Sequence, residues 1–265
     1  MLLNSVVIVL REVLEAALLV SVFLASAKFL QIKNNWVRIS IALGTIGAIA
    51  YGVSIQGVSE LFDGVGQEVC NAALQLAAFC GLLAIIFLIP RRIGSLQNPQ
   101  TAIPALMAIT VALAAAREGS EILVYVSGFW SMSNFFSAIG IGSLIGACIG
   151  CSVGVLIYYL LLAQPSQRAV PTTLVLLGLI AAGMSSQATR LLIQADWVPA
   201  AGALWDTSGV LSEQSLAGQL LYALVGYEAT PTATEVIVYV ASIALLIVAF
   251  LAGRYTAHVG IEATK

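Results

Sequence analysis

The sequence has few charged residues and little of the chemistry that most enzymes use. Asp, Glu, Lys and Arg together make up only 9% of the 265 residues, whereas a soluble domain carries about 25%. The single histidine, His258, disfavours a membrane cytochrome, which needs paired haem ligands. No glycine-rich phosphate loop is present, so any transport would draw on an ion gradient, a membrane potential or a partner.

What the sequence does have is long apolar runs. Hydrophobic residues make up 60% of the chain and the mean hydropathy is +1.00. Seven runs are long enough to cross about 30 Å of hydrocarbon, at 2–30, 36–59, 69–89, 102–128, 137–163, 170–194 and 234–253. The expected fold is therefore an all-α polytopic membrane protein with seven transmembrane helices. No cleavable signal peptide is expected, because the first run has no basic segment before it and is interrupted by charge.

The charges between the runs alternate along the chain. Lys and Arg follow the first, third, fifth and seventh runs, whereas Asp and Glu follow the second and sixth. By the positive-inside rule, this pattern places the N-terminus outside and the C-terminus in the cytoplasm. Arg190, near the outer end of the sixth run, is the exception.

Two of the runs carry the same charged pattern near their centres. The two stretches are Arg11-Glu12-Val13-Leu14-Glu15 and Arg117-Glu118-Gly119-Ser120-Glu121. An ionised side chain at mid-bilayer costs about 2.5–3.5 kcal/mol and normally faces the interior of a helix bundle. In each stretch the second glutamate lies four residues after the arginine and three after the first glutamate, so all three share one helix face.

If the two helices face each other, their charged side chains form one buried site. Four carboxylates and two guanidiniums leave that site with a net charge of −2, which predicts a cation site. The predicted metal ligands are Glu12, Glu15, Glu118 and Glu121, with Arg11 and Arg117 as their ion-pair partners. The alternative is that each Arg–Glu pair is a structural link between helices, but such a link rarely needs a second carboxylate one turn away.

Carboxylate oxygens narrow the class of ion. They suit iron, manganese, magnesium or calcium, whereas copper(I) and zinc favour thiolate and imidazole ligands. Charge balance does not choose between ferrous and ferric iron, since a divalent ion neutralises the site and a trivalent ion leaves it at +1.

The spacing of the charged stretches indicates an internal repeat. They lie 106 residues apart on the first and fourth runs, which is the period of a three-helix unit. Because three is odd, the second unit has inverted topology, and the site would lie at the interface between the units near mid-depth. The expected divisions are two three-helix repeats (1–94 and 95–195), an outer loop (196–232), and a last helix with a cytoplasmic tail (233–265).

Further polar residues gather toward the outer ends of the runs. On the third run Glu68, Asn71 and Gln75 follow a helical spacing, and Gln187 and Arg190 do so on the sixth. Acids before the third run, including Asp63, predict an acidic entrance that raises the local concentration of cations near the site. The alternative is an ordinary solvated loop. We therefore expect these six residues to be accessory or to line the entrance. Arg190 has a second possible role, as a partner for a motif carboxylate.

The outer loop contains one helical pattern. Leu216, Ala217, Leu220, Leu221 and Leu224 form an apolar stripe, which predicts a short amphipathic helix at the outer membrane interface. A lid over the entrance is the alternative.

A Cys-x-x-Cys pattern raises a competing function. Cys148 and Cys151 could belong to a membrane thiol oxidoreductase, but redox motifs of this kind sit at helix N-termini. This pair lies mid-run among glycines spaced every four residues, at 142, 146, 150 and 154, which is typical of close helix packing. Packing is therefore the favoured interpretation.

The charged motifs carry a resemblance to a known family. Two Arg-Glu-x-x-Glu motifs in membrane helices resemble the high-affinity, oxidase-dependent iron permeases, and the outer segments resemble their bacterial Efe-type branch. The matching outer segments are Leu61-Phe62-Asp63-Gly64 through Gly66-Gln67-Glu68, and Leu204-Trp205-Asp206-Thr207-Ser208 through Gly226-Tyr227-Glu228 to Glu235. The resemblance covers essentially the whole chain.

The resemblance implies a function, a location and a partner. It implies a multi-pass permease of the bacterial inner membrane that imports iron, with the motif glutamates as ligands and no enzymatic activity. Iron, ferrous or ferric, is then the substrate, and no organic cofactor is expected. An oxidase or a periplasmic iron-binding protein would act upstream. A permease for another divalent cation, such as lead or manganese, is the alternative within transport.

Overall fold

The structure is a computed structural model that describes residues 2–94, 102–129 and 133–262. Its regular elements are helices, and the described residues add one isolated β-bridge between Ala203 and Thr232. The helices are α1 (Leu2–Phe29), α2 (Asn35–Ser59), the short 3-10 helix η1 (Leu61–Gly64), α3 (Gly66–Gly94), α4 (Ala102–Ser127), α5 (Ser133–Leu162), α6 (Ser166–Gln194), α7 (Leu216–Val225) and α8 (Ala233–Glu262). The predicted all-α class is confirmed.

Six helices are long and apolar enough to cross a membrane. They are α2, α3, α4, α5, α6 and α8, which identifies a polytopic membrane protein. The first helix, α1, has 28 residues but falls outside this set, because every 18-residue stretch of it contains at least three charged residues. Its charge therefore has to be shielded by its neighbours.

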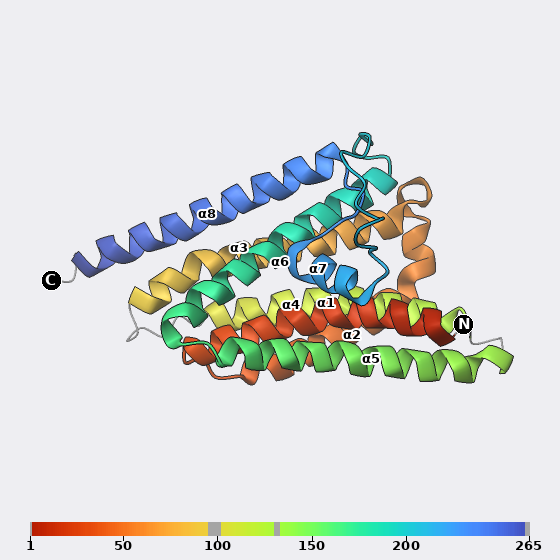
Figure 1. Ribbon diagram of the computed structural model, residues 1–265, viewed down its shortest axis with the longest axis horizontal. Helices are drawn as coiled ribbons and strands as arrows, with labels where there is room; N and C mark the ends of the chain where they lie inside the picture. Colours follow the sequence, from red (N-terminus) through yellow and green to blue (C-terminus); the bar gives the residue numbers. More distant parts are fainter. Residues whose placement is uncertain (1, 95–101, 130–132, 263–265) are drawn as a thin grey trace.

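Long helix pairs build the bundle (Figure 1). α1 packs along α5, α2 packs along α4, and α3 packs against both α6 and α8. A buried apolar core lies where α1, α3, α4 and α6 meet, and it includes Phe23, Leu82, Met107 and Leu177, none of which is exposed. The charged helix α1 is thus an inner helix, while α2, α5 and α8 carry many exposed apolar side chains.

Glycines allow the two closest helix pairs to form. A Cβ atom at Gly146 of α5 would lie 2.5 Å from the carbonyl oxygen of Val6 on α1. On the other pair, a Cβ at Gly44 of α2 would lie 2.7 Å from the Cβ of Ala115 on α4. The predicted close packing of the glycines beside Cys148 is confirmed, because they face α1.

The short helix predicted between the sixth and seventh runs is also present, as α7. The Ser215 hydroxyl caps its first turn by accepting from the backbone N–H of Gly218 at 3.0 Å. Gly226 ends it in the left-handed region, at φ +67°, where glycine is favoured. One face of the helix is buried through Gln219 and Tyr222, because α7 packs against α1 and α6 (Figure 1).

Candidate metal centre

The two charged motifs meet inside the bundle. α1 and α4 are in contact, and Glu12, Arg117 and Glu118 are all buried. Oxygen atoms of Glu12, Glu118 and Glu121 lie within 4.8 Å of one another, so three carboxylates from two helices could share one ion. The fourth predicted ligand, Glu15, is outside this group of three.

Glu15 lies between the two arginines instead. Its carboxylate is 3.5 Å from Arg11 Nε on its own helix and 3.6 Å from Arg117 Nη1 on the other. Arg117 also approaches Glu118 at 2.5 Å and Glu121 at 3.3 Å. The spacing rule correctly predicts the pairs within each helix, whereas the contact between Arg117 and Glu15 crosses from α4 to α1.

Some carboxylate oxygens in this cluster have no internal donor. Glu12 Oε2 and Glu118 Oε2 are buried and accept no hydrogen bond from the part of the chain that the structure describes. A buried polar atom without a partner costs about 1–3 kcal/mol, and more when it is charged. These oxygens are therefore free to bind a cation, which would remove that cost.

Amide side chains from α3 and α6 border the cluster. Asn71 Nδ2 donates to Glu121 Oε1 at 3.1 Å, and Asn71 Oδ1 accepts from the Tyr51 hydroxyl at 2.9 Å. With the Gln75 amide oxygen turned toward Arg117, that oxygen accepts from Nη1 at 2.6 Å and the amide nitrogen donates to Gln187 Oε1 at 3.1 Å. Three predicted accessory residues, Asn71, Gln75 and Gln187, thus lie at the site.

Tyr51 is a site residue that the sequence analysis missed. It lies on α2, and its hydroxyl donates to Asn71, which in turn donates to Glu121. The same run also contains the hydroxyls of Ser40, Thr45 and Ser54, so nothing in the sequence singles out Tyr51. Of the residues predicted at the entrance, Asp63 is exposed on η1 and Glu68 is half-buried in the first turn of α3, and neither joins the group of three carboxylates.

Comparison with known proteins identifies the family of this chain. The chain matches the Iron permease FTR1 family over residues 2–263. It belongs to that family. The resemblance inferred from the two motifs is thereby confirmed, and with it a role in iron transport across a membrane.

Named relatives agree with the family. The chain is 31% identical to the "Ferrous iron permease EfeU" of Yersinia pestis, over 97% of this chain and 96% of that one. It is 31% identical to the protein of that name from Yersinia pseudotuberculosis serotype I, over 97% and 95%, and 28% identical to that of Escherichia coli O157:H7, over 92% and 93%. No solved structure matches the chain.

Arg190 of this iron permease pairs away from the motifs. Its Nε lies 3.2 Å from Glu228 Oε1 and 3.3 Å from Glu235 Oε1. Pairing of Arg190 with a motif carboxylate, the second role considered above, is therefore wrong. The reason is that the chain after α7 returns to α6 and brings two buried glutamates to this arginine.

Glu228 gives the segment after α7 a pH-dependent stability. Burial raises its pKa to about 7, as does the neighbouring Glu235 carboxylate, while Arg190 lowers it. Folding thus favours the protonated form, since the ordinary pKa is 4.5. The stability contributed by Glu228 is fully present below about pH 4.5 and is lost as the pH rises to about 7.

Glu228→Gln is therefore expected to weaken the pH dependence of unfolding. Between pH 5 and pH 8 the midpoint of thermal unfolding should fall less in this variant than in the unmodified protein, because glutamine carries no charge to bury. The measurement is thermal unfolding in detergent at both pH values. Glu60→Gln, at an exposed acid, is the matched control. An equal fall in Glu228→Gln and the unmodified protein would contradict the assignment.

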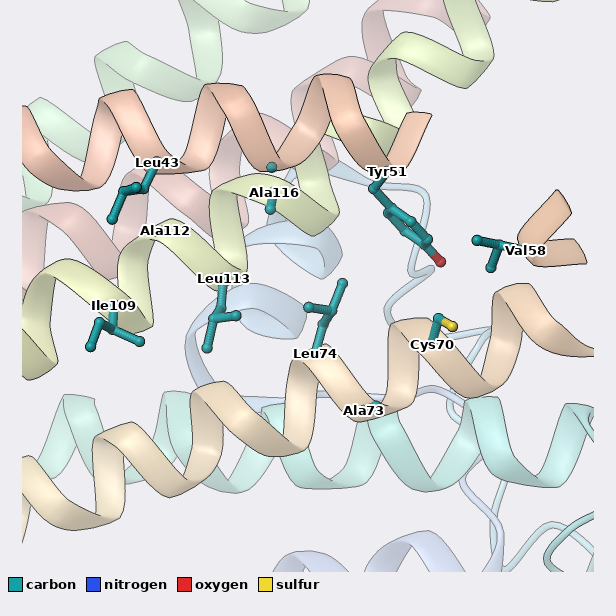
Figure 2. A pocket seen from close by; sticks show the side chains of 11 residues that line it. Leu43, Tyr51, Val58, Cys70, Ala73, Leu74, Ile109, Ala112, Leu113 and Ala116 are labelled. Atoms are coloured by element: carbon teal, nitrogen blue, oxygen red, sulfur yellow. The ribbon is translucent and has the colours of Figure 1, made fainter. Parts of the chain in front are cut away.

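A pocket of about 650 Å³ lies beside the cluster, between α2, α3 and α4. Figure 2 shows Tyr51 and Cys70 at one end of it, and Leu43 and Ile109 at the other. Its lining is apolar apart from the Tyr51 hydroxyl and the Cys70 thiol, and no motif carboxylate lines it. The pocket therefore suits apolar groups rather than the ion.

Proposed function

We propose that this protein imports iron into the cytoplasm across the bacterial inner membrane, and that Glu12, Glu118 and Glu121 bind the ion on its way. The observation that carries the proposal is the close group of three carboxylates in a chain of the iron permease family. Two of them, Glu12 and Glu118, each have a buried oxygen with no hydrogen-bond partner among the described residues. Hard oxygen ligands suit iron. Glu15, the fourth motif glutamate, is proposed to support the site by pairing with Arg11 and Arg117 rather than by binding the ion.

A ferrous ion is compatible with the charge of the motifs, but charge balance does not by itself choose between ferrous and ferric iron. The four carboxylates and two guanidiniums of the motifs sum to −2, which a divalent ion neutralises. The names of the relatives in Yersinia and Escherichia also specify ferrous iron. Before the ion binds, the two arginines reduce the repulsion between the buried carboxylates.

We further propose that α1 is a seventh span and that α1–α3 and α4–α6 form an inverted repeat. In such a repeat, α1, α2 and α3 correspond to α4, α5 and α6. The contact of α1 with α5 then corresponds to that of α4 with α2, and the contact of α3 with α6 corresponds to itself. The observed packing agrees with this correspondence. Gln75 and Gln187 meet at the α3–α6 contact. With the positive-inside rule, this arrangement puts the N-terminus outside and the C-terminus in the cytoplasm.

The exposed acids of the outer segments fit delivery from outside. Glu60 and Asp63 lie at the end of α2 and on η1, where they could attract a cation or a basic surface. A periplasmic iron-binding protein or an oxidase is the proposed donor.

Iron binding tests the ligand assignment directly. The purified protein in detergent, titrated with ferrous iron without oxygen, should bind one ion per chain. Glu12→Gln should lower the affinity by about 100-fold or more, because the loss of even a supporting group around a metal costs 10–100-fold. Glu60→Gln, at an exposed acid, should leave the affinity unchanged. An unaltered affinity in Glu12→Gln would remove Glu12 from the site.

A further inference from the structure

The buried aromatic residue of α7 touches one of the two motif arginines. The guanidinium carbon of Arg11 lies 4.1 Å from the centre of the Tyr222 ring, and Tyr222 is only 6% exposed. The two arginines differ in their surroundings. The side chain of Arg117 is 10% exposed and contacts three carboxylates, whereas that of Arg11 is 38% exposed and pairs, among the described residues, with Glu15 alone.

Contacts on the C-terminal side of α7 fix the place of this ring. A Cβ atom at Gly226 would lie 2.6 Å from the Cα of Gly183 on α6, so the two backbones touch. Glu228 and Glu235 pair with Arg190 on the same helix. These contacts hold the end of α7 against α6 (Figure 1). Tyr222 lies one turn before that end.

Arg11 could form an ion pair with either of two carboxylates on its own helix, and its neighbours decide which one. Glu15 lies one turn away on the same helix, and Glu12, the adjacent residue, belongs to the group that faces Glu118 and Glu121. If the flexible Arg11 side chain turned toward Glu12, its positive charge would compete with the cation. A ring held against the guanidinium opposes that movement.

We propose that Tyr222 is a positioning residue for the cation site: by stacking on Arg11 it keeps this guanidinium on Glu15 and leaves Glu12 free for the ion. The inference rests on the proposed function, since it presumes that Glu12 is a ligand. It also gives the outer loop a role in the affinity of the site, although the loop contributes no carboxylate to the group of three.

The test is the affinity for ferrous iron, measured on detergent-solubilised protein without oxygen. Tyr222→Leu should weaken binding by roughly tenfold, the size expected for loss of a partly desolvated cation–π contact. Tyr222→Phe keeps the ring and should bind within about threefold of the unmodified protein. Leu221→Ala, at an exposed position on the same helix, is the matched control and should bind normally.

A double-mutant cycle separates positioning from a general effect on folding. In an Arg11→Gln background, Tyr222→Leu should have no further effect, because the group on which the ring acts is gone. An equal loss in both backgrounds, or no loss in either, would overturn the proposal. If Tyr222→Leu does not reach the membrane, Tyr222→Met carries the same expectations.

The Glu12→Gln variant distinguishes failure of the proposed function from failure of the proposed role of Tyr222. If that variant binds iron normally, the proposed function fails and takes this inference with it. If it loses binding while the cycle is additive, only the role of Tyr222 is refuted.

Discussion

Iron uptake is expected to fall by about 100-fold or more when Glu118 is replaced by glutamine. Glu118 is 3% exposed and belongs to the group of three carboxylates, and it also pairs with Arg117 at 2.5 Å. Glutamine keeps the size of the side chain but removes the charge and one of two oxygen ligands, and loss of a ligand exceeds the 10–100-fold cost of losing a supporting group. Uptake of radiolabelled ferrous iron, corrected for the amount of protein in the membrane, measures the effect.

A second glutamate of the motifs provides the comparison. Glu15 is ion-paired with both arginines and lies outside the group of three, so Glu15→Gln should reduce uptake less than Glu118→Gln does. Equal losses would show that all four glutamates act as one set of ligands. Uptake at the unmodified rate in Glu118→Gln would show that the ion passes elsewhere.

The sequence predicts the composition of this site better than the division of roles within it. Spacing on one helix places Glu15 beside Arg11 and Glu121 beside Arg117, and both pairs form. The spacing contains nothing about the rotation of α1 relative to α4, which decides that Arg117 reaches across to Glu15. As a result Glu12, and not Glu15, is the α1 glutamate that joins Glu118 and Glu121.

Hydropathy locates the helices well and their ends less well. The third run was expected at 69–89, but α3 begins at Gly66 and continues past Pro90 to Gly94. The last run was expected to end at 253, whereas α8 continues to Glu262. A helix is maintained by backbone hydrogen bonds and can continue into polar surroundings, so the end of an apolar run does not mark the end of the helix.

Contacts between distant parts of the chain could not be predicted from spacing. Tyr222 meets Arg11 across more than 200 residues, and Arg190 meets Glu228 only because α7 turns the chain back toward α6. The apolar stripe of α7 predicted the helix itself. Which bundle surface would cover its buried face depends on tertiary packing, which a single sequence does not specify.

The two motif arginines should respond very differently to the same conservative change. The Arg117 side chain is 10% exposed, and its two terminal nitrogens contact Glu15, Glu118 and Glu121 on two helices. Lysine keeps the charge but offers one nitrogen, which cannot hold three carboxylates in the same geometry. Loss of one charge-assisted hydrogen bond costs about 1.5–3 kcal/mol, so Arg117→Lys should reduce iron uptake by roughly tenfold or more.

Removal of the charge at this position should have the larger consequence of preventing stable folding. Breaking a buried ion pair by removing one partner costs about 3–5 kcal/mol. Arg117→Gln would leave carboxylates on both α1 and α4 without the guanidinium that pairs with them. Little of this variant should reach the membrane. Arg11, in contrast, is partly exposed and holds one carboxylate, so Arg11→Lys should keep uptake within about threefold. The test is to measure membrane abundance and iron uptake for all three variants. If lysine has equal effects at positions 11 and 117, the guanidinium of Arg117 supplies only its charge. Its contacts across the α1–α4 pair would then be unnecessary for the site.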